Sequence, residues 1–325
     1  MKLKKKHHYV SQFYLKAWSI QNDQIFASDE KRPPFLVKTN ATAYSKFFYR
    51  VNPLSVNGIF ALDNIARMLN ANDTIIYEKV IKSINRVIYK TKIFQDSFAP
   101  EQYDSIHELN ETIKEVQTNC LEDYFAFFED KVSIIFKKIL KTKVIHLDWN
   151  DYQLLIFFIT LQLLRTRKTI DQANKEFHKY HPNLTKDEMY TISIYTSLIM
   201  NSKLSQSLTS NLHTLHIINN NTNLNIITSD NPCINYKFHE TNNTEFECIF
   251  PLSPHIYLIL KENSYSESTK KFILTDIENK PNENLINTLI FLEETSDLNK
   301  IIWVNSLIKK HKNRYVYAQN YKDLK

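Results

Sequence analysis

Glycine is almost missing from this sequence: among 325 residues it occurs once, at Gly58. A P-loop and a dinucleotide-binding fingerprint both need several glycines, because backbone N–H groups must come close to phosphate oxygens. The sequence therefore excludes both kinds of nucleotide site. Phosphate binding here must rely on side chains or on the N-terminus of a helix.

Cysteine is also scarce. Cys120, Cys233 and Cys248 are an odd number, and no two of them have the CxxC spacing. This pattern argues against a disulfide framework and against a structural zinc site, and it favours a reducing compartment.

Long hydrophobic runs are lacking too. The longest one, residues 154–164, is interrupted by Thr160 and Gln162 and is too short to span a bilayer. The basic residues within 2–6 are followed by His7 and His8, where a signal peptide has its apolar region. We therefore expect a soluble, cytoplasmic protein that contacts no membrane. Self-association and a protein partner are left open.

The charge is mildly basic. The net charge of +6 comes from 41 basic and 35 acidic residues, and part of it gathers at Lys309, Lys310, Lys312 and Arg314. Such a cluster attracts nucleic acid or an acidic partner, or it is simply a solvated face. Both interpretations stay open.

The pattern along the chain predicts an α+β fold. Residues 1–60 carry strand and turn signals, residues 61–208 carry helical periodicity, and residues 209–325 mainly alternate like strands. Helices in the middle and strands at both ends favour α+β over α/β. We predict a single composite domain over 1–325, in which the helical region packs against a C-terminal, mainly antiparallel sheet.

Individual elements can be expected as well. Helices are indicated at 121–140, after the capping residue Asp148, at 186–208 and between Glu283 and Glu294. Strands are indicated at 212–219, 223–229, 245–250, 255–261, 300–304 and 314–318. The Asn-rich stretch 220–222 is expected to join the first two of these strands as a hairpin.

The N-terminal segment His7-His8-Tyr9-Val10-Ser11-Gln12-Phe13-Tyr14-Leu15 mixes polar and aromatic side chains densely. On a strand, His7 and His8 point to opposite faces, so we expect only one of them to face a site. Ser11 is expected to cap a short helix. The segment either supplies a histidine as general base or metal ligand, or it is an aromatic anchor whose histidines bind the backbone.

Polar residues also occur on apolar helix faces. Gln162 and Arg165 extend the buried stripe that includes Phe158, and a buried guanidinium must be paired. The partner is either a carboxylate on the preceding helix or an anionic ligand. Glu122 and Glu129 of that helix are candidate partners of Arg165, and also candidate metal-ligating or acid–base carboxylates.

A third candidate group is Thr228-Ser229-Asp230-Asn231-Pro232, at the end of an expected strand. These residue types are those of an ordinary turn. A strand end also holds a carboxylate rigidly, which makes Asp230 the candidate functional residue of this turn.

Together these groups resemble a known pattern. The segment at His7 resembles the HHYVPQFYL signature of a widespread bacterial family, domain of unknown function 4238, and the groups at Glu122, Arg165 and Asp230 occur in the order that family shows. Ser11 stands where the family has proline, and the region around Arg314 matches only loosely. The resemblance implies one constellation but no activity; its members are His7 or His8, Gln12, Gln162, Arg165 and Asp230.

Two functions follow as hypotheses. The first is a hydrolase acting on phosphodiesters, a nuclease-like effector of bacterial defence or of a toxin system. In it His8 or His7 activates water, Asp230 orients it, and Arg165 stabilises negative charge. A divalent metal is a candidate cofactor, with the candidate ligands His8, Asp230, Glu122 and Glu129. The second is a non-catalytic binding module for a small anionic ligand or nucleic acid.

Overall fold

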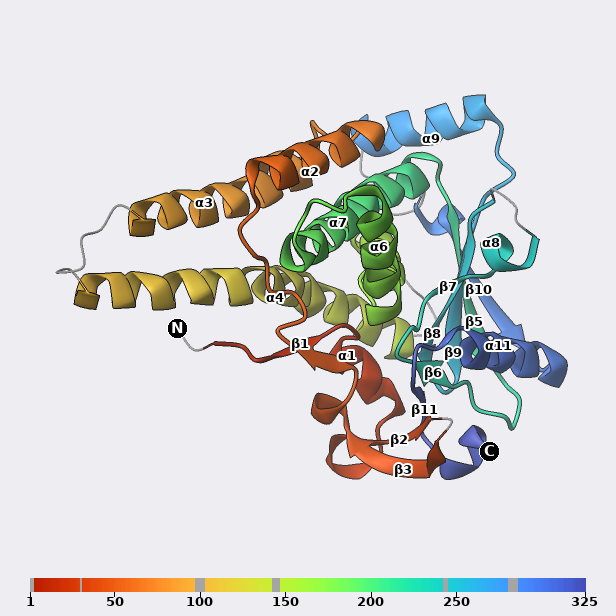
Figure 1. The fold of residues 1–325 in the computed structure, drawn as a ribbon. Coiled ribbons are helices and arrows are strands. Elements are labelled where there is room, and N and C mark those ends of the chain that lie inside the picture. Colours follow the sequence, from red (N-terminus) through yellow and green to blue (C-terminus); the bar gives the residue numbers. More distant parts are fainter. Residues whose placement is uncertain (1–2, 30, 97–102, 142–146, 242–244, 280–285) are drawn as a thin grey trace. The chain divides into compact units, whose positions relative to one another are not determined.

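The computed structural model describes residues 3–29, 31–96, 103–141, 147–241, 245–279 and 286–325 (Figure 1). The chain divides into two compact units. Unit 1 comprises Met1–His8, Tyr44–Phe127 and Arg167–Lys203, and unit 2 comprises Tyr9–Ala43, Phe128–Thr166 and Leu204–Lys325. The fold class is α+β, as the sequence predicts.

Unit 1 is mainly helical. Its two-stranded antiparallel sheet pairs β1 (Lys6–His8) with β4 (Tyr44–Lys46). Its helices are α2 (Val56–Met68), α3 (Lys82–Asp96), α6 (Arg167–Tyr180) and parts of α4 (Tyr103–Lys141) and α7 (Lys186–Ser210). The expected helices at 121–140 and 186–208 are confirmed by α4 and α7.

The start of α7 explains why the one glycine stands where it does. Thr185 and Glu188 form a capping box, in which the backbone N–H of each residue donates to the other's side chain. The second carboxylate oxygen of Glu188 accepts from the Ser55 N–H at 2.7 Å. A Cβ atom at Gly58, in α2, would lie 3.0 Å from that oxygen. Any larger residue at position 58 would therefore press on this carboxylate.

Unit 2 contains two sheets. The five-stranded sheet has the order β10-β5-β9-β8-β7 and the four-stranded sheet the order β3-β2-β11-β6. The first consists of β5 (Thr214–Asn220), β7 (Ile234–Asn235), β8 (Glu247–Ser253), β9 (Ile256–Lys261) and β10 (Ile290–Thr295). The second consists of β2 (Gln24–Asp29), β3 (Arg32–Lys38), β6 (Thr228–Ser229) and β11 (Val316–Ala318). Only β5 with β10 is parallel among these pairs.

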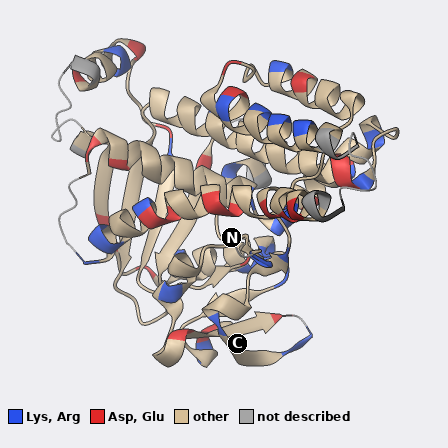
Figure 2. Ribbon diagram, turned by 90° about the vertical axis from the view of Figure 1, so that its left-hand side faces the viewer, with Lys and Arg blue, Asp and Glu red and all other residues tan. Residues whose placement is uncertain are grey.

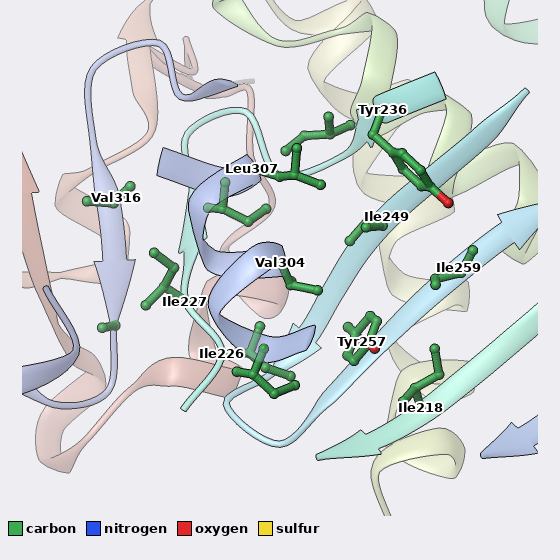
Figure 3. Packing of buried hydrophobic residues seen from close by; sticks show 14 of the residues in the cluster. Ile218, Ile226, Ile227, Tyr236, Ile249, Tyr257, Ile259, Val304, Leu307 and Val316 are labelled. Atoms are coloured by element: carbon green, nitrogen blue, oxygen red, sulfur yellow. The ribbon is translucent and has the colours of Figure 1, made fainter. Parts of the chain in front are cut away.

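The core of unit 2 forms around α11 (Leu298–His311). Val304 and Leu307 on this helix lie among Ile249 and Tyr257 of the five-stranded sheet and Val316 of β11 (Figure 3). Burial of such side chains contributes roughly 1.5–3 kcal/mol each. The helix thus joins the two sheets into one hydrophobic core.

The strand expected at 300–304 is wrong, because these residues belong to α11. Asp297 caps the helix by accepting the Asn299 N–H at 2.9 Å. The buried residues Ile301 and Val304 are followed by Leu307 and Ile308, which is helical spacing. The expected stretch of five residues was too short to show that period.

The expected hairpin of 212–219 with 223–229 is also wrong. β5 pairs with β9 and β10, whereas β6 pairs with β11 in the other sheet. Between them Ile227 donates its N–H to the Asn305 side chain at 3.0 Å instead of to a strand. The Asn-rich stretch is a turn, but it leads the chain from one sheet to the other.

The helix expected between Glu283 and Glu294 is likewise corrected. Residues 283–285 lie outside the described residues, and residues 290–295 form β10, which runs parallel to β5. By contrast, the helix predicted after Asp148 is confirmed as α5 (Trp149–Leu164). Asp148 accepts the Asp151 N–H at 2.7 Å, as a capping residue does.

Charged residues of both signs are interspersed along the helices (Figure 2). In the part of the chain that the structure describes, no helix combines the length and the apolar character that crossing a membrane requires.

A first prediction concerns Glu188. Burial acts to raise the pKa of its carboxyl, but hydrogen bonds from Ser55 and Thr185 outweigh this effect and lower the pKa from 4.5 to about 2. Because the pKa is lower in the folded state, the carboxylate stabilises the fold fully above about pH 4.5 and progressively less as pH falls toward 2. We expect Glu188→Gln to reduce the free energy of unfolding at pH 7 by roughly 1–2 kcal/mol.

Urea unfolding of both proteins between pH 7 and pH 3 measures this difference, which should shrink as the pH falls. Glu176→Gln is the matched control, because Glu176 makes an exposed ion pair with Lys179 and should matter little. A loss of stability that is equally large at pH 3 would contradict the prediction.

Candidate functional site

The turn after β6 centres on Asp230, whose side chain is fully buried. One carboxylate oxygen accepts the backbone N–H of Asn313 at 2.9 Å. The other accepts the backbone N–H of Tyr315 at 3.1 Å. The backbone N–H of Arg314 donates to both oxygens, at 3.2 and 2.9 Å. The Asp230 N–H donates in turn to the Tyr315 carbonyl at 3.0 Å. Asp230 therefore fixes the loop between α11 and β11.

This environment acts on the Asp230 pKa in two directions. Burial raises the pKa above its usual value, and the backbone N–H donors of Tyr315, Asn313 and Arg314 lower it. Because both carboxylate oxygens accept hydrogen bonds from this backbone, the geometry is that of a loop anchor.

The other side chains of the turn are bonded as well. Thr228 Oγ1 lies 2.6 Å from the Tyr14 hydroxyl, and the Asn231 amide donates to the His311 carbonyl at 2.9 Å. Thr166 donates its hydroxyl to Asn231 Oδ1 at 2.9 Å. The turn thereby connects the N-terminal segment, the residues after α5 and the end of α11.

Arg165 follows α5 and is 1% exposed. Its guanidinium donates to Ser11 Oγ at 2.7 Å and forms an ion pair with Glu129 of α4. With the Gln162 amide oriented so that its oxygen faces the guanidinium, that oxygen accepts at 2.9 and 3.0 Å. Gln162 and Arg165 are thus brought together. The charged partner of Arg165 is a carboxylate on the preceding helix, which is one of the two arrangements that the sequence left open.

Ser11 differs in detail from expectation. It does occupy the position before the short helix α1 (Gln12–Leu15), but its side chain makes no capping hydrogen bond. Its hydroxyl accepts from Arg165 instead, because the buried guanidinium requires acceptors. The Ser11 φ of −60° is close to the value that a proline ring imposes.

His7 and His8 lie on β1 in unit 1. The His7 side is fully buried and the His8 side is partly exposed, in agreement with the alternation of a strand. His7 Nδ1 accepts the Tyr49 N–H at 2.8 Å, and Nε2 lies 2.9 Å from the Lys4 carbonyl. Since Nδ1 accepts a proton donor, the ring is neutral with its proton on Nε2. Burial also lowers the pKa of His7, so this histidine anchors the strand.

His8 has a carboxylate beside it. Its backbone N–H donates to Glu122 Oε1 at 3.5 Å, and its ring contacts Tyr44 with 5.6 Å between centroids. His8 and Glu122 therefore lie together in unit 1. Their proximity to Arg165 and Asp230 stays a prediction, because those two residues belong to unit 2.

Within the described ranges, no group of three or more His, Cys, Asp or Glu side chains is placed to hold a metal ion.

A basic hollow in unit 2 was not foreseen as a whole. It has a volume of about 430 Å³, and its lining residues are Asp29, Lys31, Lys312, Asn313 and Arg314. Lys312 and Arg314 belong to the basic cluster that is visible in the sequence. Lys31 and Arg32 were not predicted to join them, because only the pairing of β2 with both β3 and β11 brings that hairpin to the loop after α11.

Two arginines at this basic hollow are held in place by their neighbours. The Asp29 side chain is 5% exposed, and its Oδ2 lies 3.4 Å from Arg32 Nε and 3.9 Å from Arg314 Nε. The Arg32 guanidinium carbon stands 3.7 Å from the Phe35 ring centre, and that of Arg314 stands 4.8 Å from the Tyr315 ring centre. Each arginine thus contacts the Asp29 carboxylate and the ring of an aromatic residue.

Comparison with known proteins gives one match. The family model described as "Protein of unknown function (DUF4238)" matches residues 6–322, nearly the whole chain. The searches of curated proteins and of solved structures returned no match.

A second prediction concerns Ser11. Ser11→Ala removes an acceptor of the buried Arg165 guanidinium and should reduce the free energy of unfolding by roughly 1–3 kcal/mol. Ser11→Pro removes the same acceptor, but its φ fits the native backbone, and the stiffer unfolded chain returns about 0.4–1 kcal/mol. We expect the order of stability Ser11, Ser11→Pro, Ser11→Ala in urea unfolding.

Ser11→Thr is the control, since it keeps a hydroxyl at this position and should stay nearest to the original protein. The prediction is wrong if Ser11→Pro proves less stable than Ser11→Ala.

Proposed function

Because this chain belongs to the DUF4238 family of proteins of unknown function, we propose a function from its own geometry: unit 2 is a binding module for phosphate-bearing anions. One observation carries the proposal. Basic side chains from two segments far apart in the sequence, Lys31 from one and Lys312 and Arg314 from the other, line the basic hollow, and Arg32 forms an ion pair with Asp29, which also lines it. A non-catalytic binding module for an anionic ligand was one of the two hypotheses from the sequence, which placed the ligand at the constellation around Arg165 and Asp230 and not at this hollow.

Charge supports the proposal. Among the described residues, Lys31, Lys312 and Arg314 line the basic hollow together with Asp29, and Arg32 adds a fourth positive charge through its ion pair with that carboxylate, which Arg314 also approaches. Arg32 and Arg314 have side chains that are 49% and 61% exposed, so solvent and ligands reach them. A local excess of positive charge of this kind attracts anions and concentrates them.

The arginine geometry supports it further. A guanidinium binds phosphate best when its planar fork is already fixed, because less conformational entropy is lost on binding. Asp29 contacts Arg32 and Arg314 through their Nε atoms, and the rings of Phe35 and Tyr315 support their planes. The volume of about 430 Å³ lies in the range of small-ligand sites.

Asp230 enters this function as a positioning residue. It touches the backbone N–H groups of Asn313, Arg314 and Tyr315 from the buried side. It thereby sets where Arg314 stands without being among the residues that line the basic hollow.

A third prediction tests the proposal with a probe that carries phosphates without bases, a fluorescein-labelled abasic oligodeoxynucleotide. We expect saturable binding in fluorescence anisotropy at low salt. Arg32→Ala and Arg314→Ala should each raise the Kd about tenfold, the effect of losing a charge-assisted contact of about 1.4 kcal/mol. Lys38→Ala is the matched control, because Lys38 is an exposed residue at the opposite end of β3.

Asp230→Asn separates positioning from simple charge. Removing a negative charge strengthens anion binding if the loop stays in place. If Asp230 positions the loop, the same change weakens binding, and this is the expected result. Circular dichroism checks that the variant is folded. Absence of probe binding, or binding unchanged in both arginine variants, overturns the proposed function.

A hydrolase acting on phosphodiesters is a second proposal. The observation in its favour is that the backbone N–H of His8 donates to Glu122 Oε1 at 3.5 Å, so that a carboxylate lies against the residue that carries the imidazole. Histidine and glutamate side chains are common general bases and metal ligands. A divalent metal, a nuclease-like role in bacterial defence or a toxin system, and a cytoplasmic location belong to this proposal.

A fourth prediction tests it. The purified protein should cleave mixed nucleic acids in the presence of Mn²⁺ or Mg²⁺, and His8→Ala and Glu122→Gln should each reduce the rate at least a hundredfold, as loss of acid–base or metal chemistry does. The control is His255→Ala, which removes an exposed histidine. His7→Ala would not serve as a control, because His7 anchors β1. No cleavage, or cleavage unaffected by both variants, overturns this second proposal.

A further inference from the structure

We infer that the anion bound at the basic hollow is an unpaired nucleotide, whose phosphate meets the basic side chains and whose base stacks on the arginine and aromatic planes beside them. This inference rests on the proposed binding function and names its ligand class.

Two pairs of planar side chains, each an arginine and an aromatic ring, lie beside the basic hollow. Arg32 lies over Phe35 and Arg314 over Tyr315, at 3.7 and 4.8 Å from the ring centres. The two rings are themselves neighbours, with 6.4 Å between centroids and an angle of 76° between planes. Arg32 Nη2 also reaches the Tyr315 hydroxyl at 3.5 Å. Two arginine–aromatic pairs therefore stand side by side.

The guanidinium planes can take a stacked base. A guanidinium that rests on a ring with one face offers its other face to a further planar group, and unpaired bases stack on arginine planes and aromatic rings. The exposure of 49% for Arg32 and 61% for Arg314 leaves room for such a group. An inorganic anion would bind to the positive charges of this site but would not stack on its guanidinium and aromatic planes.

The site suits an unpaired nucleotide better than a duplex. In a duplex the base faces are covered by their neighbours, so only an unpaired base offers a face for stacking. Duplex readers place a helix or a strand ribbon in a groove about 12 Å wide. Here the ligand-facing groups come from the end of the β2–β3 hairpin and from the loop after α11. A hollow of about 430 Å³ suits one small ligand.

The fifth prediction compares four probes by anisotropy or competition: a ten-nucleotide single strand, an abasic strand with the same number of phosphates, a duplex of the same sequence, and a nucleoside monophosphate. The single strand should bind at least tenfold more tightly than the abasic strand and the duplex, since stacking of one base contributes about this factor or more. If the monophosphate competes with the single strand, a free nucleotide is sufficient as the ligand. If it does not compete, the ligand is a nucleotide within a strand.

Two variants remove the rings while keeping the charges. Phe35→Leu and Tyr315→Leu should each weaken single-strand binding more than abasic binding, so that the tenfold preference for the single strand shrinks toward one. Tyr321→Leu is the matched control, because Tyr321 also carries a cation over its ring, that of Lys325 at 4.9 Å, but belongs to neither of the two arginine–aromatic pairs.

The outcomes separate the two proposals. Equal affinity for single strand and abasic strand overturns the nucleotide inference and leaves the binding function standing. Tighter binding of the duplex than of the single strand overturns the inference too. If neither the single strand nor the abasic strand binds, both the inference and the proposed function fail.

Discussion

The buried carboxylate of Asp230 is the constraint on which the rest of unit 2 depends. Three successive backbone N–H groups, from Asn313 to Tyr315, converge on its two oxygens. These groups would otherwise lack partners at the point where α11 ends and the chain turns toward β11, and an unpaired buried N–H costs about 1–3 kcal/mol. One side chain therefore decides where α11 stops and where β11 enters the sheet.

The same turn ties together segments that the chain separates widely. Thr228 contacts the Tyr14 hydroxyl, and Asn231 joins Thr166 to the His311 carbonyl. Next to Thr166, Arg165 holds the N-terminal segment through Ser11. Buried polar networks are stable only when their members are bonded. The motifs that carry the family resemblance within unit 2 are thus linked by hydrogen bonds, which gives a physical reason for their occurrence together.

What the sequence could predict follows from the range of the interactions. The Asp148 cap and the pairing of Arg165 with a carboxylate one helix earlier depend on local spacing and on the cost of a buried charge; the cap was predicted, and the pairing was one of the two arrangements that the sequence left open. The basic hollow was not predicted, because Arg32 and Arg314 are brought together only by sheet pairing across almost the whole chain. The strand expected at 300–304 failed for a related reason: a short β-branched run takes the structure that its tertiary partners select.

The division of roles in unit 2 favours a surface function over a buried one. Arg165 and Asp230 looked like ligand-binding groups in the sequence, yet both are buried and engaged with protein partners. Arg32 and Arg314 have the opposite properties, since they are exposed while their carboxylate and aromatic contacts fix them. Side chains that meet a ligand must be reachable and preorganised together. The buried network supplies the rigidity, and the hairpin and loop that it positions supply the chemistry.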